Sequence, residues 1–171
     1  MTPWWTSVSD GGLAQGDYLP RCLAPLIPYD YGESSRATVE SRVMDLVVLT
    51  QTCDLANSKV KHVVLCPARA VTNLITSDPN YAKRSSLKPV RRGQVTALHL
   101  LASPITPADN LAALYVDFRQ IVSLPTGYLS RHAAALGDRW RLASPYVEHM
   151  SQAFARFFMR VGLPSDIPPY K

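Results

Sequence analysis

Four consecutive polar side chains, Gln51 to Asp54, are the residues in this chain best placed for chemistry. They directly follow the aliphatic run Leu46 to Leu49, in which Val47 and Val48 leave no polar face. Such a run is typical of a strand, here at 44–50, that is buried on both sides. We therefore expect this strand to deliver a ligand-binding segment to one end of a sheet, made of Gln51, Thr52, Cys53 and Asp54.

Cys53 introduces two other kinds of site. With His62 as a base it could act as a thiol nucleophile, whereas free cysteine is most often a buried structural residue. A zinc site would need Cys53, His62 and Cys66, perhaps with Cys22. Along a strand, His62 and Cys66 stand about 13 Å apart, whereas the ligands of one zinc ion lie within about 4 Å of each other. We therefore predict no metal and no cofactor, and a cysteine-dependent enzyme using Cys53 remains an alternative.

Basic residues are unevenly distributed along the chain, which has a formal net charge of +5. The segment 83–92 contains lysines and arginines but no acid, which is typical either of a nucleic-acid contact or of a solvated loop. Arg156 and Arg160, one helical turn apart, could hold a phosphate together with Arg139 and Arg141, or could lie on a solvated helix face. The predicted nucleic-acid-binding residues are Lys83, Arg84, Lys88, Arg91, Arg92, Arg156 and Arg160.

Composition favours one globular domain. The chain of 171 residues is long enough to bury a core without disulfides or metal. Its residues are 47% hydrophobic and 18% charged, which is typical of a globular protein. We expect a single domain over 1–171, with 1–14 and 165–171 as peripheral ends and 69–96 as a basic insertion. No apolar run is long enough to cross a bilayer, so no membrane contact is expected. Three cysteines without a disulfide framework favour the cytoplasm.

Prolines and apolar runs predict the elements of the N-terminal half. A short strand is expected at 15–19, and the prolines that follow predict an irregular loop over 20–40. The run 60–65, ended by Pro67, predicts a strand that pairs with 44–50 much as in a hairpin.

Two more strands and one helix are predicted in the C-terminal half. The strands are expected at 97–101 and at 114–122, where Asp117 and Arg119 share a face and could form an ion pair. The helix is expected at 145–160, because apolar residues recur there every three or four positions. Its apolar face comprises Val147, Met150, Phe154, Phe157 and Val161.

The order of these segments resembles that of the PemK/MazF family. The family has a "GD" strand, an "RPVLVLS"-like strand, a "VAPIT"-like strand, a "VDLSQI"-like strand and a terminal helix. The matching segments here are Gly16-Asp17-Tyr18, Val47 to Thr50, Val63 to Pro67 and Val116 to Ile121, followed by the C-terminal helix. The pattern GD, QTCDL, VDFRQ and QAFARFFMRVGLP also resembles uncharacterised bacterial proteins.

The resemblance implies an α+β fold: a small, bent antiparallel SH3-like β-barrel with the C-terminal helix packed on it. It also implies a toxin-like or defence protein that binds single-stranded RNA or a protein partner, such as an antitoxin-like neighbour. The alternative it implies is a metal-independent endoribonuclease. The family's catalytic arginine falls near Met44, so Arg42 would take its role, assisted by Thr50 or Thr52.

Overall fold

The computed structural model describes residues 3–28, 30–32, 39–105 and 112–159. Within them the chain is α+β, and its sheets are antiparallel. The strands are β1 (Trp5–Val8), β2 (Tyr18–Leu26), β3 (Glu40–Val48), β4 (His62–Ala70), β5 (Leu98–Leu101), β6 (Leu114–Asp117), β7 (Val122–Pro125) and β8 (Arg139–Leu142). The helices are α1 (Thr52–Ala56), α2 (Val71–Ser77), α3 (Lys88–Arg91), α4 (Thr126–Leu136) and α5 (Tyr146–Phe158), with 3-10 turns at Pro79–Tyr81 and Arg84–Leu87.

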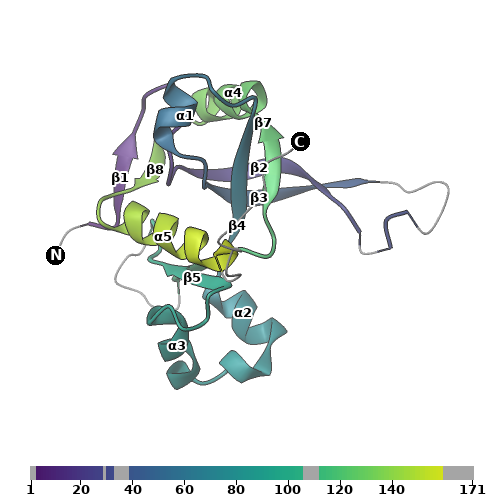
Figure 1. The fold of residues 1–171 in the computed structure, drawn as a ribbon, viewed down its shortest axis with the longest axis vertical. Helices are drawn as coiled ribbons and strands as arrows, with labels where there is room; N and C mark the ends of the chain where they lie inside the picture. Colours follow the sequence, from purple (N-terminus) through teal and green to yellow (C-terminus); the bar gives the residue numbers. More distant parts are fainter. Residues whose placement is uncertain (1–2, 29, 33–38, 106–111, 160–171) are drawn as a thin grey trace, which may run out of the picture.

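The predicted strand at 44–50 is the centre of the fold, as the C-terminal half of β3. Its side chains alternate between two cores. Leu46 and Val48 pack in the core under α4, whereas Val47 and Leu49 pack in the core under α5. Figure 1 shows α4 at the top of the molecule and α5 crossing its middle. The prediction of a strand buried on both sides is confirmed.

Strand β4 holds the sheet together by pairing with three strands. Its first half pairs with β7, its second half with β6, and its middle with β3 on the other side. The prediction that Pro67 ends this strand is wrong. Pro67 pairs with Leu46 of β3, and it lies between the residues that pair with β7 and those that pair with β6. A proline is tolerated there because no ladder bond on that side needs its missing N–H.

The prediction of an irregular loop over 20–40 is also wrong in its first part. Pro20 and Pro25 lie within β2, which pairs with β3 in a long two-stranded arm (Figure 1). Strand β2 is at the end of the strand order, and the register shifts between Leu19 and Cys22, around Pro20. Edge strands and irregular positions are where a sheet accepts proline.

The predicted strand at 114–122 divides into β6 and β7. Asp117 makes the turn between them: its Oδ1 accepts the Arg119 N–H at 3.0 Å, and its carbonyl accepts the Gln120 N–H at 2.9 Å. The predicted ion pair is confirmed, with Arg119 Nη2 2.7 Å from Asp117 Oδ2. The strand at 97–101 is confirmed as β5.

The N-terminal residues are not peripheral, contrary to expectation. β1 pairs with β8, Trp5 and Leu13 are buried, and Trp5 Nε1 donates to the Ala102 carbonyl at 2.9 Å. The predicted C-terminal helix is confirmed as α5, which buries Met150 and packs Phe154 and Phe157 against Phe118. Val161 and 165–171 lie outside the described residues.

The basic insertion at 69–96 forms a helical unit with a small core of its own. Val71, Leu74, Leu87 and Val90 pack there with residues of β5 and β6. Figure 1 shows α2 and α3 below β5, at the end of the molecule opposite α1 and α4. The described part of this segment therefore contains two short helices, α2 and α3, and the two 3-10 turns between them. The strand order β2-β3-β4-β6-β5 does not close on itself within the described residues.

Candidate functional site

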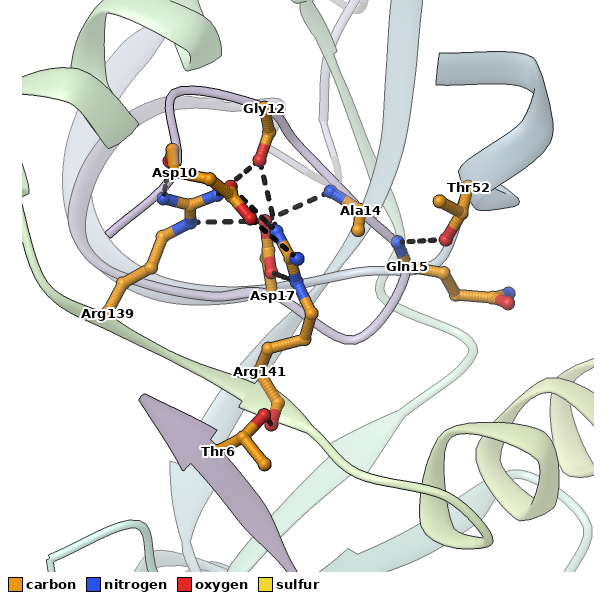
Figure 2. Close-up of polar contacts among 9 residues, drawn as sticks. All are labelled: Thr6, Asp10, Gly12, Ala14, Gln15, Asp17, Thr52, Arg139 and Arg141. Carbon is orange, nitrogen blue, oxygen red and sulfur yellow. Dashed lines mark hydrogen bonds and ion pairs between the residues drawn. The ribbon is translucent and has the colours of Figure 1, made fainter. Parts of the chain in front are cut away.

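The polar segment predicted to bind a ligand forms the start of α1. Gln51 occupies the N-cap position, and Gln51, Thr52 and Cys53 are exposed. Thr52 Oγ1 accepts the Gln15 N–H at 3.1 Å, which ties the segment to the loop before β2 (Figure 2). Asp54 lies 3.7 Å from Lys59 Nζ. The N–H of Asn57 donates to the Cys53 carbonyl at 3.2 Å, and no hydrogen bond from Ala56 or Asn57 to the Asp54 carboxylate is found in the described residues.

Cys53 lies apart from the groups that a thiol nucleophile needs. Its Sγ lies 3.6 Å from Gln51 Oε1 and 3.8 Å from Asp54 Oδ1, and both atoms are acceptors. No imidazole contacts it among the described residues, in which no cluster of metal-ligating side chains is found either. The other two cysteines, Cys22 and Cys66, are buried, and burial raises the pKa of Cys66 to about 12.

The residues predicted for ribonuclease chemistry do not come together. Arg42 is exposed on the β2–β3 arm, where its Nη2 lies 3.7 Å from Glu40 Oε2. At about 3.3 Å per residue, the end of β3 at Val48 lies roughly 20 Å from Arg42. Thr50 Oγ1 accepts the Val64 N–H at 2.8 Å and so holds the end of the strand. Thr50 has a structural role here, and Arg42 lies far from both threonines.

A network of buried charges lies beside the predicted segment. Arg139 Nε lies 3.1 Å from Asp17 Oδ2, and neither side chain is exposed to solvent. Arg141 also binds Asp17, through Nε to Oδ1 and through Nη2 to Oδ2 at 3.1 Å. Both arginines reach Asp10, and both donate to the Gly12 carbonyl (Figure 2). The expectation that Arg139 and Arg141 hold a phosphate is wrong, because their donors are used inside the protein.

The network fixes the loop that precedes β2. Asp17 Oδ2 accepts the Ala14 N–H at 3.0 Å, and Gly16 turns the chain with a φ of 84°. A β-carbon at Gly16 would lie 2.9 Å from Leu142 Cβ, so only glycine lets the loop approach β8 this closely. The hydrogen bond from Arg141 lowers the pKa of Asp10, and the hydrogen bond to Asp17 raises the pKa of Arg141. Both pKa shifts keep the groups charged: the Asp10 carboxyl stays deprotonated to lower pH, and the Arg141 guanidinium stays protonated to higher pH.

A cleft of about 570 Å³ opens next to this network. It lies between the loop before β2, the start of α1, the end of β8 and the first half of α5. Its polar lining comes from Gln15, Thr52, Arg141, Glu148, Ser151 and Gln152, and its apolar lining from Ala14, Leu142 and Val147. Of the four residues predicted to bind a ligand, only Thr52 lines this cleft. Arg141 was considered from the sequence only as a phosphate ligand, and Gln15, Glu148, Ser151 and Gln152 were not predicted as site residues.

A basic surface is the second candidate site. It comprises Lys83, Lys88, Arg91, Arg92 and Arg156, all of which are exposed. α3 ends at Arg91 with Arg92 as its C-cap, and Gly93, with a φ of 67°, turns the chain sharply after them. A β-carbon at Gly93 would lie 3.9 Å from Arg156 Nη1, so the guanidinium of Arg156 on α5 reaches the turn that follows α3. The structure therefore brings together two basic segments that are more than sixty residues apart in the sequence.

The charges of the basic surface are not neutralised by acidic partners in the described part of the chain. None of the ion pairs found there involves Lys83, Lys88, Arg91, Arg92 or Arg156. Arg156 Nη2 lies 3.5 Å from Gln152 Oε1, and Gln152 lines the cleft. The basic surface and the cleft are therefore adjacent along α5. Arg160 and the side chain of Arg84 lie outside what the structure describes.

No match to this chain was found among protein-family models, curated proteins or solved structures. In the described part of the chain, no helix is both long and apolar enough to span a lipid bilayer. A function is therefore inferred from the residues and their geometry.

Proposed function

We propose that this protein binds single-stranded RNA through the basic surface. The observation that supports this most is the approach of the Arg156 guanidinium to Gly93, which places a cation of α5 next to the basic segment that ends in Arg91 and Arg92. Lysines and arginines without acidic partners bind phosphates with a gain in counterion entropy. Proteins that bind single strands regardless of sequence use a basic groove or face that follows the sugar-phosphate backbone of the nucleic acid.

The resemblance to the PemK/MazF family belongs to the same proposal, including an SH3-like barrel and a toxin-like or defence role in the bacterial cytoplasm. It is supported by strand β4, which pairs with β3 on one side and with β7 and then β6 on the other, so that one strand takes part in two sheets. Catalysis is not proposed, because Arg42 lies far from Thr50 and Thr52.

Binding to a fluorescein-labelled single-stranded RNA, followed by anisotropy, tests the proposal. Replacing Lys88, Arg91 and Arg92 with serine should weaken binding at least tenfold. The matched control replaces Lys59, Lys61 and Arg131 with serine, since these exposed residues lie in or beside α1 and α4, at the other end of the molecule. Equal losses in the two triple variants would show that only net charge matters and would overturn the proposed site.

A protein partner is a second candidate, favoured by the exposed apolar residues of the β2–β3 arm. Leu23 and Val43 face each other across the two strands, and they are 52% and 63% exposed. Ile27 near the end of the arm is 67% exposed. Pairs of large apolar side chains in water are typical of interaction sites. Co-purification with the product of an adjacent reading frame, lost on replacing Leu23 and Val43 with aspartate, would support this function.

A further inference from the structure

The cleft beside Gln15 has the wrong charge for a phosphate. Among the described residues that line it, the one cation is Arg141, which is already bound by Asp17 and Asp10. The one other charged group in that lining is the Glu148 carboxylate. A phosphate entering the cleft would therefore meet a carboxylate and no available cation. The occupant that suits it is neutral and has both polar edges and flat apolar faces.

The lining offers hydrogen-bonding groups at several positions. Gln15 Nε2 donates to the Leu49 carbonyl at 2.8 Å and lies 3.4 Å from Ser151 Oγ, which holds the amide in place. Figure 2 shows the Gln15 side chain pointing away from the Asp17 network. Thr52 and Ser151 each accept one hydrogen bond from Gln15 and retain a hydroxyl proton to donate. Leu142 and Val147 supply apolar contact.

The cleft adjoins the basic surface through one pair of side chains. Gln152 lines the cleft, and Arg156, one turn later on α5, reaches it at 3.5 Å. A strand whose phosphates bind Arg156 and the end of α3 would therefore pass the mouth of the cleft. Unstacked RNA bases are commonly turned into such recesses and read by their hydrogen-bonding edges.

We propose that the cleft receives one unpaired base of the bound RNA and prefers bases that carry an exocyclic amino group. This inference rests on the proposed function. Glu148 determines the preference, because a carboxylate accepts the amino protons of cytosine and would face the O4 acceptor of uracil. Arg156 holds the adjoining phosphate outside. A volume of about 570 Å³ is in the range of sites that enclose small ligands.

Two twelve-nucleotide RNAs test the preference, oligocytidylate and oligouridylate. Oligocytidylate should bind about tenfold more tightly, as one such contact discriminates between bases by about 5- to 150-fold. Glu148→Gln should bring the two affinities close together, because its amide can both donate and accept. Glu40→Gln, on the exposed arm, is the control and should leave the ratio unchanged. Equal affinities in the unaltered protein would overturn the base preference and leave RNA binding by the basic surface standing.

Free nucleosides separate this inference from the proposed function, because they carry no phosphate. Amide NMR signals of Gln15, Thr52, Ser151 and Gln152 should shift on adding millimolar cytidine, and shift less with uridine. The absence of cytidine-induced shifts at these four residues would overturn the base site whatever the oligonucleotides do. Shifts at the cleft without any binding of oligonucleotides would support the base site and contradict the role of the basic surface.

Discussion

Asp17 and Arg139 form an ion pair that is wholly removed from solvent, with Arg139 Nε 3.1 Å from Asp17 Oδ2. The two residues are 122 positions apart, and their contact joins the loop before β2 to the first residue of β8. Neighbouring groups bind both partners, because Arg139 also donates to Asp10 and to the Gly12 carbonyl and Asp17 also accepts from Arg141 and Ala14. Buried charges need such additional hydrogen bonds. It keeps Ala14 and Gln15 in place beside α5, so the cleft depends on it.

Replacing Arg139 with methionine should therefore destabilise the protein by about 1.5–3 kcal/mol, because buried Asp17 would lose its charged hydrogen bond from Arg139 and keep those from Arg141. Arg131→Met is the control. Arg131 is exposed on α4, and the change should alter stability by no more than about 0.5 kcal/mol. Urea unfolding measures both. Similar midpoints for the two variants would contradict the importance of the buried pair.

Phe154 should contribute to the core of the C-terminal helix. It packs edge-on against Phe118 at 5.4 Å and is only partly buried, so Phe154→Ala should cost about 2–3 kcal/mol, somewhat below the usual range for buried phenylalanine. Phe158 is 56% exposed, and Phe158→Ala should cost less than about 1 kcal/mol. Thermal unfolding of the two variants provides the comparison. A larger loss of stability for Phe158→Ala than for Phe154→Ala would show that Phe154 does not lie on the buried face of α5.

His99 should make stability depend on pH. Its Nε2 is buried and has no hydrogen-bond partner among the residues that the structure describes, and burial, aided by nearby His149, lowers its pKa from 6.5 to about 4. The unfolded chain therefore binds a proton at a higher pH than the folded chain does. Stability should be full above pH 6.5 and decline by about 3 kcal/mol as the pH falls to about 4.

Substituting His99 with leucine should remove most of that decline, whereas His62→Gln, at an exposed position, should not. Chemical denaturation at several pH values between 4.5 and 7.5 distinguishes them. A slope that persists in His99→Leu would assign the pH dependence to other groups.

In the segment that follows β3, the Thr50 side chain should contribute more to the free energy of unfolding than the Asp54 side chain does. Thr50→Val removes the acceptor of the Val64 N–H and should cost about 1–3 kcal/mol. The contacts found for these two side chains in the described residues are local: Asp54 with Lys59 and Cys53, and Gln51 with Cys53. Asp54→Ala and Gln51→Ala should therefore each cost less than about 1 kcal/mol. Equilibrium unfolding of the three variants would show a different order if the Asp54 carboxylate held the turn.

Local patterns predicted the central elements, because those patterns reflect burial directly. The continuous apolar run at Leu46 to Leu49 and the spacing of Met150, Phe154 and Phe157 both appear in the structure as expected. The predictions based on prolines were wrong, because whether a strand tolerates Pro25 or Pro67 depends on the strands beside it in the sheet. That information is absent from the local sequence.

The site was harder to predict, because its residues come from distant segments. Gln51 to Asp54 pointed to the right end of β3, but only Thr52 reaches the cleft. The spacing of Arg139 and Arg141 on either side of Trp140 places both on one face of a strand, which was a usable signal for a shared partner. Their partner, Asp17, could not be identified without the pairing of β1, β2 and β8. Likewise, the segment 83–92 was predicted to be basic, but its contact with Arg156 was not foreseen.

The salt dependence of RNA affinity tests the central claim most directly. Each phosphate contact that is lost lowers the slope of log K against log salt by about 0.7 for a single strand. A variant with serine at Lys83, Arg84, Lys88, Arg91 and Arg92 should therefore show a slope smaller by up to about 3.5. A second variant, with serine at Arg21, Arg42, Lys59, Lys61 and Arg131, should retain the slope of the unaltered protein. An unchanged slope in the first variant would contradict RNA binding by the basic surface.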